Sequence, residues 1–289
     1  MSSNIEGLDL SDFSEMTPEE VNANLIHVWS WRGPLYELSA NSLMMDYGGP
    51  AFAKLHRRLS DLFGRPDPVN IVLLGTANVA SYMLLGWETG LVNQFNSNRR
   101  NGISKEQNME LVMFTQLYAG MRGLGHVYRS VGDLLPAIGP PVVEPAFAEG
   151  WAPDPEAFRA GLDLSRPEMT SVDRERLAAW YEANIGYVPD SILFGIKYHP
   201  EFVKVQRAKW EAAIRTLPKQ FAPHLMIRLN MMTGNVEGLR EAVLLARSWG
   251  ISREHVVKGI TASAVFFTSF EGLHTAHRAV DDILDAWQG

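Results

Sequence analysis

The chain contains no cysteine among its 289 residues. This absence excludes disulfides, zinc–thiolate sites, iron–sulfur clusters and thiol nucleophiles. Long hydrophobic runs are missing as well, because apolar stretches such as Val69–Leu74 are too short to cross a bilayer. Residues 1–20 are polar and acidic and have no apolar segment typical of a secretory signal. We therefore expect a soluble, cytoplasmic protein that does not bind membranes.

The chain also has no excess of positive charge. It carries 26 Lys and Arg residues against 33 Asp and Glu residues, a formal net charge of −7. Nucleic-acid binding requires clustered Lys and Arg, so we expect no nucleic-acid partner. Hydrophobic residues make up 46% of the chain, which is enough for a globular protein with an apolar core.

Sustained alternation of apolar and polar residues, the pattern of β-strands, is missing throughout. We therefore predict an all-α protein. Prolines concentrate between positions 136 and 167, and their density prevents a continuous helix there. This segment is predicted to be a linker.

Four short blocks of the first half recur in the same order in the second half, which indicates an internal duplication. The paired blocks are Pro50–Lys54 with Pro200–Lys204, Gly86–Leu91 with Gly234–Leu239, Gly102–Glu106 with Gly250–Glu254, and Tyr118–Leu124 with Phe267–Leu273. The predicted organisation is an N-terminal arm (1–48), a first repeat (49–135), a proline-rich linker (136–180) and a second repeat (181–289).

The recurring Gly-Ile-Ser step predicts a joint between two helices in each repeat. Gly102 and Gly250 suit the left-handed position that follows the end of a helix. Ser104 and Ser252 suit the N-cap of the next helix, and Gln107 completes a capping box with Ser104.

These features resemble the AhpD-like, or carboxymuconolactone decarboxylase-like, helical superfamily. The resemblance is carried by Gly186–Pro189 followed by His199–Phe202, by the Gly-Ile-Ser joint, and by Leu117–Gly120. It implies an AhpD-like helical fold of two tandem divergent repeats, packed antiparallel around one core. It also implies a homo-oligomer assembled through helical faces.

The chain departs from this superfamily at the positions that carry its chemistry. Peroxidase-type members have Cys-x-x-Cys-x-x-x-His on the first helix of the unit, and these places fall on Trp87, Gly90 and Gln94. The second copy has Asn235, Gly238 and Ala242 there. Peroxidase activity is therefore excluded, and the histidine that decarboxylase-type members usually keep is replaced. Trp87 is included among the candidate substrate-binding residues.

Two amides of the first repeat form the basis of a predicted pocket. Gln94 and Asn98 share one face of a helix on which the second repeat has Ala242 and Ala246. An unpaired buried amide costs about 1–3 kcal/mol, so amides persist most easily where they meet water or a substrate. We predict that the first repeat keeps the pocket and the second supplies scaffold. The alternative is that both amides bind backbone near the helix end.

Polar residues near this face could complete an active site. Arg122 and His126 are four residues apart, hence neighbours on one helix face. Arg122 could hold a substrate carboxylate, and His126 or Glu88 could move a proton. Tyr118 is a further substrate-binding candidate. The alternative is a solvated Arg–His face without a catalytic role.

The second repeat carries a histidine pattern whose role is left open. Glu271, His274 and His277 drift around the helix, so one metal ion would strain to reach all three. We therefore predict no metal site and no cofactor, and expect a surface pair between His277 and Asp281.

The resulting prediction is a cofactor-independent lyase (decarboxylase) or isomerase. Its substrate would be a small carboxylated ring-cleavage product of aromatic catabolism, transformed by proton transfer. Two alternatives stay open: a non-catalytic binding or assembly protein that lost the AhpD-type active site, and an ester or lactone hydrolase.

Overall fold

The structure is a computed structural model that describes residues 7, 9, 14–23, 47–61 and 67–287. The chain divides into two compact units, Met1–Ile71 and Val72–Gly289. Most of the predicted N-terminal arm lies outside the described residues. The first unit extends past the predicted boundary at residue 48, because helix α3 (Gly49–Asp61) belongs to it.

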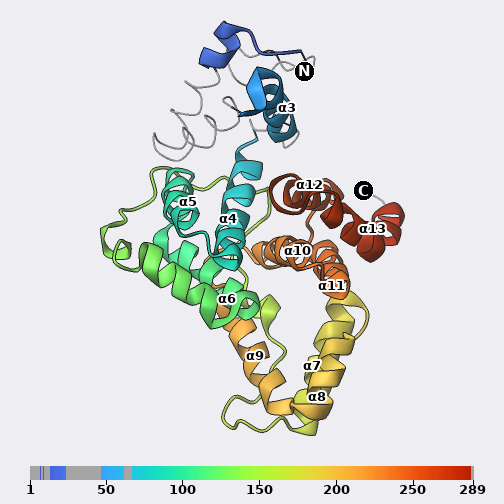
Figure 1. The fold of residues 1–289 in the computed structure, drawn as a ribbon. Helices are drawn as coiled ribbons and strands as arrows, with labels where there is room; N and C mark the ends of the chain where they lie inside the picture. The colour runs from blue at the N-terminus through green and yellow to red at the C-terminus, as the bar shows by residue number, and fades with distance from the viewer. Residues whose placement is uncertain (1–6, 8, 10–13, 24–46, 62–66, 288–289) are drawn as a thin grey trace. The chain divides into compact units, whose positions relative to one another are not determined.

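The described residues are helical and contain no β-strand beyond one isolated bridge between Pro153 and Pro218, which confirms the all-α prediction. The remaining elements follow α3 in chain order (Figure 1). They are α4 (Pro68–Leu85), α5 (Glu88–Arg100), α6 (Lys105–Val127), η2 (Tyr128–Gly132), η3 (Leu135–Ala137), η4 (Pro155–Phe158), α7 (Ser171–Ile185), α8 (Asp190–Tyr198), α9 (Pro200–Ala213), α10 (Phe221–Thr233), α11 (Val236–Ser248), α12 (Arg253–Ser263), η5 (Ala264–Thr268) and α13 (Ser269–Ala286).

The predicted helix joints form as the local chemistry requires. Gly102 and Gly250 have φ values of 95° and 75°, in the left-handed region that favours glycine. Ser104 and Gln107 form the predicted capping box at the start of α6. Ser252 accepts a hydrogen bond from the backbone N–H of His255 at the start of α12. Both joints are confirmed.

Several features occur at matched positions in the two halves. Helices α5 and α11 begin 148 residues apart and end 148 residues apart. Gly120 interrupts α6 with φ 61° and ψ −160°, and Ser269 interrupts the later run with φ 51° and ψ −144°. These correspondences favour the predicted duplication, which itself stays a prediction.

The proline-rich segment ends earlier than predicted. Helix α7 begins at Ser171, inside the segment 136–180, because no proline follows Pro167 until Pro189. Thr170 caps the helix, and Asp173 completes a capping box with it. Residue 181, the predicted start of the second repeat, therefore lies within a helix rather than at its start.

A buried ion pair fixes α7 to α9. Lys204 Nζ lies 2.9 Å from Asp173 Oδ2, and their side chains are 2% and 1% exposed. The first unit contains a similar arrangement, in which Thr17 and Glu20 cap each other and Lys54 Nζ lies 3.4 Å from Glu20 Oε1. A lysine held by a capping-box carboxylate thus occurs once in each unit.

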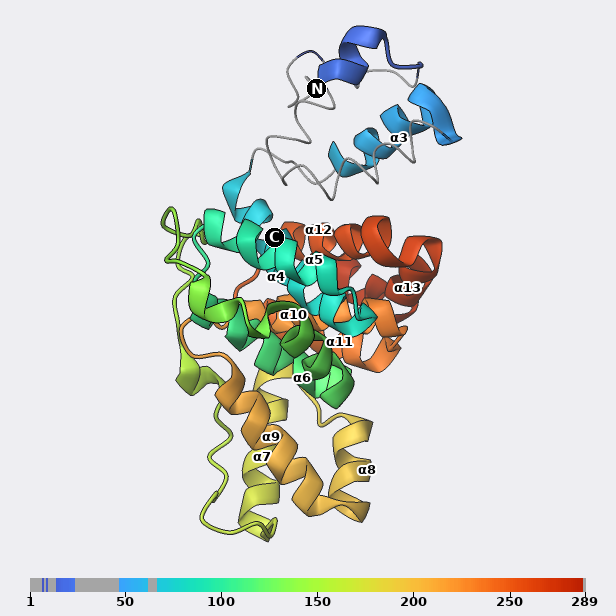
Figure 2. The same cartoon turned by 60° about the vertical axis from the view of Figure 1, so that its left-hand side comes forward.

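In the second unit, α7, α8 and α9 lie together below α6, α10 and α11 in both views (Figures 1 and 2). Helix α9 packs against α6, and α11 packs against α7 and α10. Buried Glu110 of α6 accepts hydrogen bonds from the backbone N–H groups of Arg215, Thr216 and Leu217 at 2.9–3.2 Å. These hydrogen bonds fix the loop between α9 and α10 to α6.

The run Arg253–Ala286 is long and apolar enough, by length and composition alone, to cross a membrane. It is not one straight helix, because the backbone break at Ser269 separates α12 and η5 from α13. Helices α12 and α13 pack against α10 and α11 in the fold.

Candidate functional site

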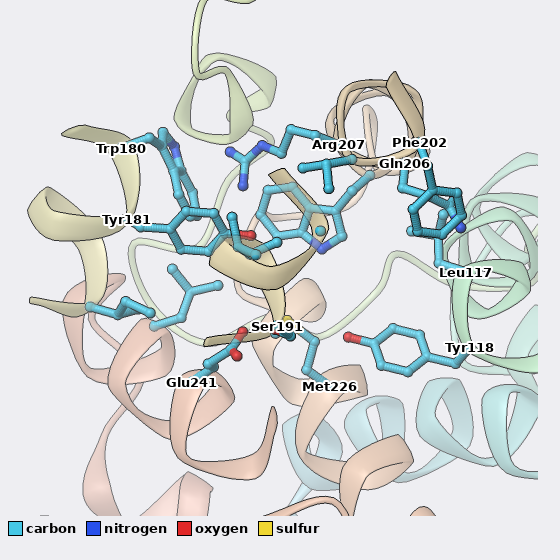
Figure 3. Close-up of a pocket in the computed structure, with 16 residues that line it drawn as sticks. Leu117, Tyr118, Trp180, Tyr181, Ser191, Phe202, Gln206, Arg207, Met226 and Glu241 are labelled. Atoms are coloured by element: carbon cyan, nitrogen blue, oxygen red, sulfur yellow. The ribbon is translucent and has the colours of Figure 1, made fainter. Parts of the chain in front are cut away.

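A cavity of about 370 Å³ lies among α6, α7, α8, α9, α10 and α11 (Figure 3). Its volume is in the range of small-molecule sites, and most of its wall is aromatic or aliphatic. The lining residues are Leu117, Tyr118, Trp180, Tyr181, Ile185, Ser191, Ile192, Gly195, Phe202, Val203, Gln206, Arg207, Trp210, Met226, Glu241 and Leu245.

Glu241 is the ionisable group of this wall that is best suited to proton transfer. Burial, and in addition the nearby charge of Glu237, raise the pKa of its carboxyl to about 7. A carboxyl with such a pKa is partly protonated at neutral pH, so it can both donate and accept a proton.

Two tyrosines of the wall have hydroxyl groups that stay protonated. Burial raises the pKa of Tyr118, and the charge of Glu241 adds to the shift. Burial also raises the pKa of Tyr181, although the positive charge of Arg207 opposes the shift. Figure 3 shows the Tyr118 hydroxyl pointing into the space between the helices. Both hydroxyls can therefore act as hydrogen-bond donors to a ligand oxygen.

Arg207 is a fixed part of the wall. Its guanidinium carbon lies 3.8 Å from the ring centroid of Trp180 and 4.5 Å from that of Trp210. Its Nε donates to Glu211 Oε1 at 2.9 Å, and the Phe158 carbonyl accepts a second hydrogen bond. The charge of Arg207 is thus largely balanced before a ligand enters, and its side chain is rigid.

Gln206 adds an unused acceptor to the wall. Its Oε1 atom is buried and has no hydrogen-bond partner among the described residues. A buried acceptor without a partner is costly, so a ligand hydroxyl or amine that donates to it would gain affinity. The site therefore suits a small, mostly apolar molecule with a few hydrogen-bonding groups.

Tyr118 is the predicted site residue that the structure brings to this cavity. Arg122, one turn further along α6, is exposed and does not line it. The predicted carboxylate clamp is therefore absent from the cavity, where Arg207 is the arginine of the wall.

His126 and Glu88, the two candidates for proton transfer, contact each other outside the cavity. His126 Nδ1 lies 3.1 Å from Glu88 Oε1, and Arg129 Nε donates to the same oxygen at 2.8 Å. The hydrogen bonds from His126 and then Arg129 lower the pKa of Glu88. The side chain of His126 is 15% exposed and that of Glu88 is 40% exposed, and the buried Nε2 of His126 has no hydrogen-bond partner in the described part of the chain. Arg122 is exposed but His126 is mostly buried, so the solvated Arg–His face of the alternative is present only at Arg122.

Gln94 and Asn98 belong to a chain of buried amides. Asn78 Nδ2 donates to Gln94 Oε1 at 3.4 Å, Gln94 Nε2 donates to Asn98 Oδ1 at 2.9 Å, and Asn98 Nδ2 donates to Asn108 Oδ1 at 2.7 Å. Neither Gln94 nor Asn98 lines the Glu241 cavity. The amides bind each other rather than an open space, which favours a structural role over the predicted substrate contact.

The other predicted positions also lie outside the cavity. Trp87 stacks edge-on against Tyr82, with ring centroids 4.5 Å apart. Glu271 and His274 are exposed, and no group of three potential metal ligands occurs in the described part of the chain. The predicted surface pair is present, because His277 Nδ1 lies 3.0 Å from Asp281 Oδ2.

Comparison with known proteins identifies the fold but no family. No family model matches the chain, and no curated protein matches it at a significant level. One solved structure is similar over 94% of this chain and 99% of its own, with a TM-score of 0.57 and 13% sequence identity. It is a Burkholderia xenovorans protein provisionally named a gamma-carboxymuconolactone decarboxylase subunit. This chain has an AhpD-like all-α fold.

Proposed function

We propose that the Glu241 cavity binds a small organic acid and that Glu241 transfers a proton to or from it. The chain would thus be a lyase of the decarboxylase type or an isomerase. The observation that carries the proposal is a largely buried carboxyl group with a pKa of about 7 in the wall of a partly open, mostly apolar cavity. A general acid or base works best when its pKa is close to the ambient pH.

The wall offers the groups that such a reaction needs. If a carboxyl group leaves as carbon dioxide, the electron pair of the broken carbon–carbon bond forms an enolate. The hydroxyls of Tyr118 and Tyr181 can donate hydrogen bonds to the enolate oxygen. Glu241 can then give its proton to the carbon. An isomerisation would use the same groups, with Glu241 removing a proton from one carbon and returning it to another.

Support for an acid as the substrate comes from the fold neighbour, which is named for a carboxylated lactone. A substrate carboxylate near Glu241 would raise the pKa of Glu241 further and keep it protonated, as a proton donor requires. Arg207 is the positively charged residue among those that line the cavity.

A non-catalytic ligand-binding protein is the second candidate. It is favoured by Arg207, whose charge Glu211 already balances, and by a mostly apolar wall. Such a wall can bind a ligand without any reaction. An ester or lactone hydrolase would use Glu241 to activate water.

The test is to incubate the purified full chain with a panel of muconate- and lactone-type acids. Binding is followed by the fluorescence of Trp180 and Trp210, which line the cavity, and turnover by product analysis. Glu241→Gln should keep binding and lose turnover by roughly two to four orders of magnitude. Glu182→Gln, an exposed carboxyl on α7, is the matched control and should not differ from the wild type.

Each result decides between the candidates. Binding without turnover in the wild type identifies a binding protein. Turnover that survives Glu241→Gln removes Glu241 from the mechanism. If no acid of the panel changes the tryptophan fluorescence, an acid is not the ligand of this cavity.

We also propose that the chain assembles as a homo-oligomer and acts in the cytoplasm, as its superfamily resemblance and composition led us to expect. Sedimentation equilibrium of the purified chain tests the assembly, and a mass equal to that of the single chain contradicts it.

A further inference from the structure

Arg228 of α10 is a buried cation without a polar partner. Its side chain is 2% exposed, which makes it one of the largest fully buried side chains of the described residues. None of its three guanidinium nitrogens has a hydrogen-bond partner in the described part of the chain. Arg228 does not line the Glu241 cavity, so it is a separate feature of the fold.

The neighbours of Arg228 are aromatic. Its guanidinium carbon lies 4.9 Å from the ring centroid of Phe267. The ring of Tyr82, itself buried, lies 6.0 Å from that of Phe267. No acidic side chain forms an ion pair with Arg228 among the residues that the structure describes. A cation above an aromatic ring is attracted to it, but this attraction offsets only part of the cost of burying a charge.

The charge of Arg228 persists at neutral pH. Burial lowers the pKa of Arg228 to about 10, which leaves the guanidinium protonated near pH 7. Burial first, and the charge of Arg228 in addition, lower the pKa of His224 to about 4. His224 is therefore neutral, and its Nε2 lies 2.9 Å from the carbonyl oxygen of Leu73. No negative charge in this environment balances the guanidinium.

Packing alone does not require a charge at this position. The matched position of the first half, 148 residues earlier, is Ala80, which is fully buried. The segment that places Phe267 over Arg228 is the π-helix η5, which ends where Ser269 has φ 51°. Such irregular helical segments often occur at functional sites, and a positive φ at a non-glycine residue is uncommon. An unpaired arginine thus lies under the least regular part of the C-terminal helices.

We propose that Arg228 is a binding site for a small monocarboxylate of the size of formate or acetate. A carboxylate can accept two parallel hydrogen bonds from a guanidinium, and the guanidinium nitrogens of Arg228 have no other hydrogen-bond partner in the described part of the chain. The anion would neutralise the buried charge and satisfy its donors. The site does not depend on Glu241 or on the proposed proton transfer.

The experiment titrates acetate into the purified full chain by calorimetry, and records the unfolding temperature with acetate replacing chloride at constant ionic strength. The wild type should show saturable binding and an unfolding temperature that rises with acetate. Arg228→Met should lose both effects. Arg228→Lys keeps a charge but not the planar fork, and should bind roughly tenfold more weakly. Arg278→Met, an exposed arginine on α13, is the matched control and should behave as the wild type.

The variants keep the result decisive. Equal acetate binding by the wild type and Arg228→Met overturns the proposal, and so does a wild type without saturable binding. If Arg228→Met does not fold, unchanged acetate affinity in Arg228→Lys overturns it. Glu241→Gln should keep the acetate effect, so a failure of the proposed enzymatic function leaves this site standing.

Discussion

Glu241 of α11 and Tyr118 of α6 share the wall of one cavity, and the charge of Glu241 helps to raise the pKa of Tyr118. The two residues are far apart in the sequence, and each comes from a different half of the chain. Their coupling means that the state of one group affects the other. When Glu241 is protonated, it no longer carries the negative charge that raises the pKa of Tyr118.

Replacing Tyr118 by phenylalanine should therefore affect chemistry more than folding. The change removes one hydroxyl from the cavity and leaves the ring in place. We expect turnover of an accepted acid to fall by roughly tenfold or more, because an oxygen of the transition state loses a donor. Steady-state kinetics on the variant checks this. An unchanged kcat would show that Tyr118 does not contact the reacting atoms.

Glu241 should make the folded state less stable as the pH rises. Its pKa in the folded state is about 7, against 4.5 in an unfolded chain, so the folded state binds more protons between these values. Stability from this group is complete below pH 4.5 and is lost as the pH approaches about 7. The loss should be roughly 2–3 kcal/mol. Urea unfolding across this window measures it.

Glu241→Gln is the comparison for this titration. The variant has no carboxyl at this position, so its unfolding free energy should vary less with pH between 4.5 and about 7. Equal slopes for the wild type and the variant would show that Glu241 titrates normally.

Asp173 should have the opposite dependence on pH. Burial alone would raise its pKa, but hydrogen bonds from the Asp163 N–H and from Lys204 outweigh burial and hold the pKa well below 3.8. Its contribution is therefore present above pH 3.8 and is lost as the pH falls further. Asp173→Asn should cost about 3–5 kcal/mol, because it leaves the Lys204 charge buried and unpaired.

The double variant Asp173→Asn with Lys204→Met separates the charge from the packing. It removes both charges and should be more stable than Asp173→Asn alone. Unfolding in guanidinium chloride gives the three free energies. If the double variant is instead less stable than Asp173→Asn, removing the unpaired Lys204 charge does not restore stability. The ion pair itself would then stabilise the fold.

The amides Gln94 and Asn98 should contribute to stability and not to ligand binding. Each replacement by alanine breaks the chain of hydrogen bonds that includes Asn78 and Asn108, and should cost about 1–3 kcal/mol. Ligand binding in the Glu241 cavity should be unchanged. Thermal unfolding and ligand-dependent tryptophan fluorescence measure the two effects. Weaker binding in either variant would restore the predicted substrate contact.

The local parts of the fold could be predicted from the sequence. The joints at Gly102 and Gly250 depend on a few adjacent residues, whose backbone and capping preferences act at short range. The surface pair of His277 and Asp281 follows from helical spacing for the same reason. In both cases every group that decides the outcome lies within one or two turns of helix.

The cavity could not be predicted in this way. It combines residues from six helices, and Glu241 lies beside the apolar face of α11 rather than on the face compared between the repeats. Trp180 and Trp210 of its wall belong to a cluster with Trp249, in which the ring centroids lie within 6.4 Å of one another. Sequence patterns do not show which distant residues such a cluster encloses.

The similarity between the N-terminal unit and the α7–α9 region could not be found by comparing sequences either. Thr17, Glu20 and Lys54 interact as Thr170, Asp173 and Lys204 do, but the offset changes from 153 residues at the threonines to 150 at the lysines. The carboxylate is also a glutamate in one place and an aspartate in the other. Only the contacts show the correspondence.

The carboxylate of Glu110 has a consequence for how the chain could be divided. One side chain that precedes the proline-rich segment holds three successive amides of a loop that follows it. Tyr118 likewise comes from before that segment and completes a wall built from after it. Cutting the backbone between residues 136 and 150 should therefore produce two fragments that remain associated. Neither piece alone would have a complete interior.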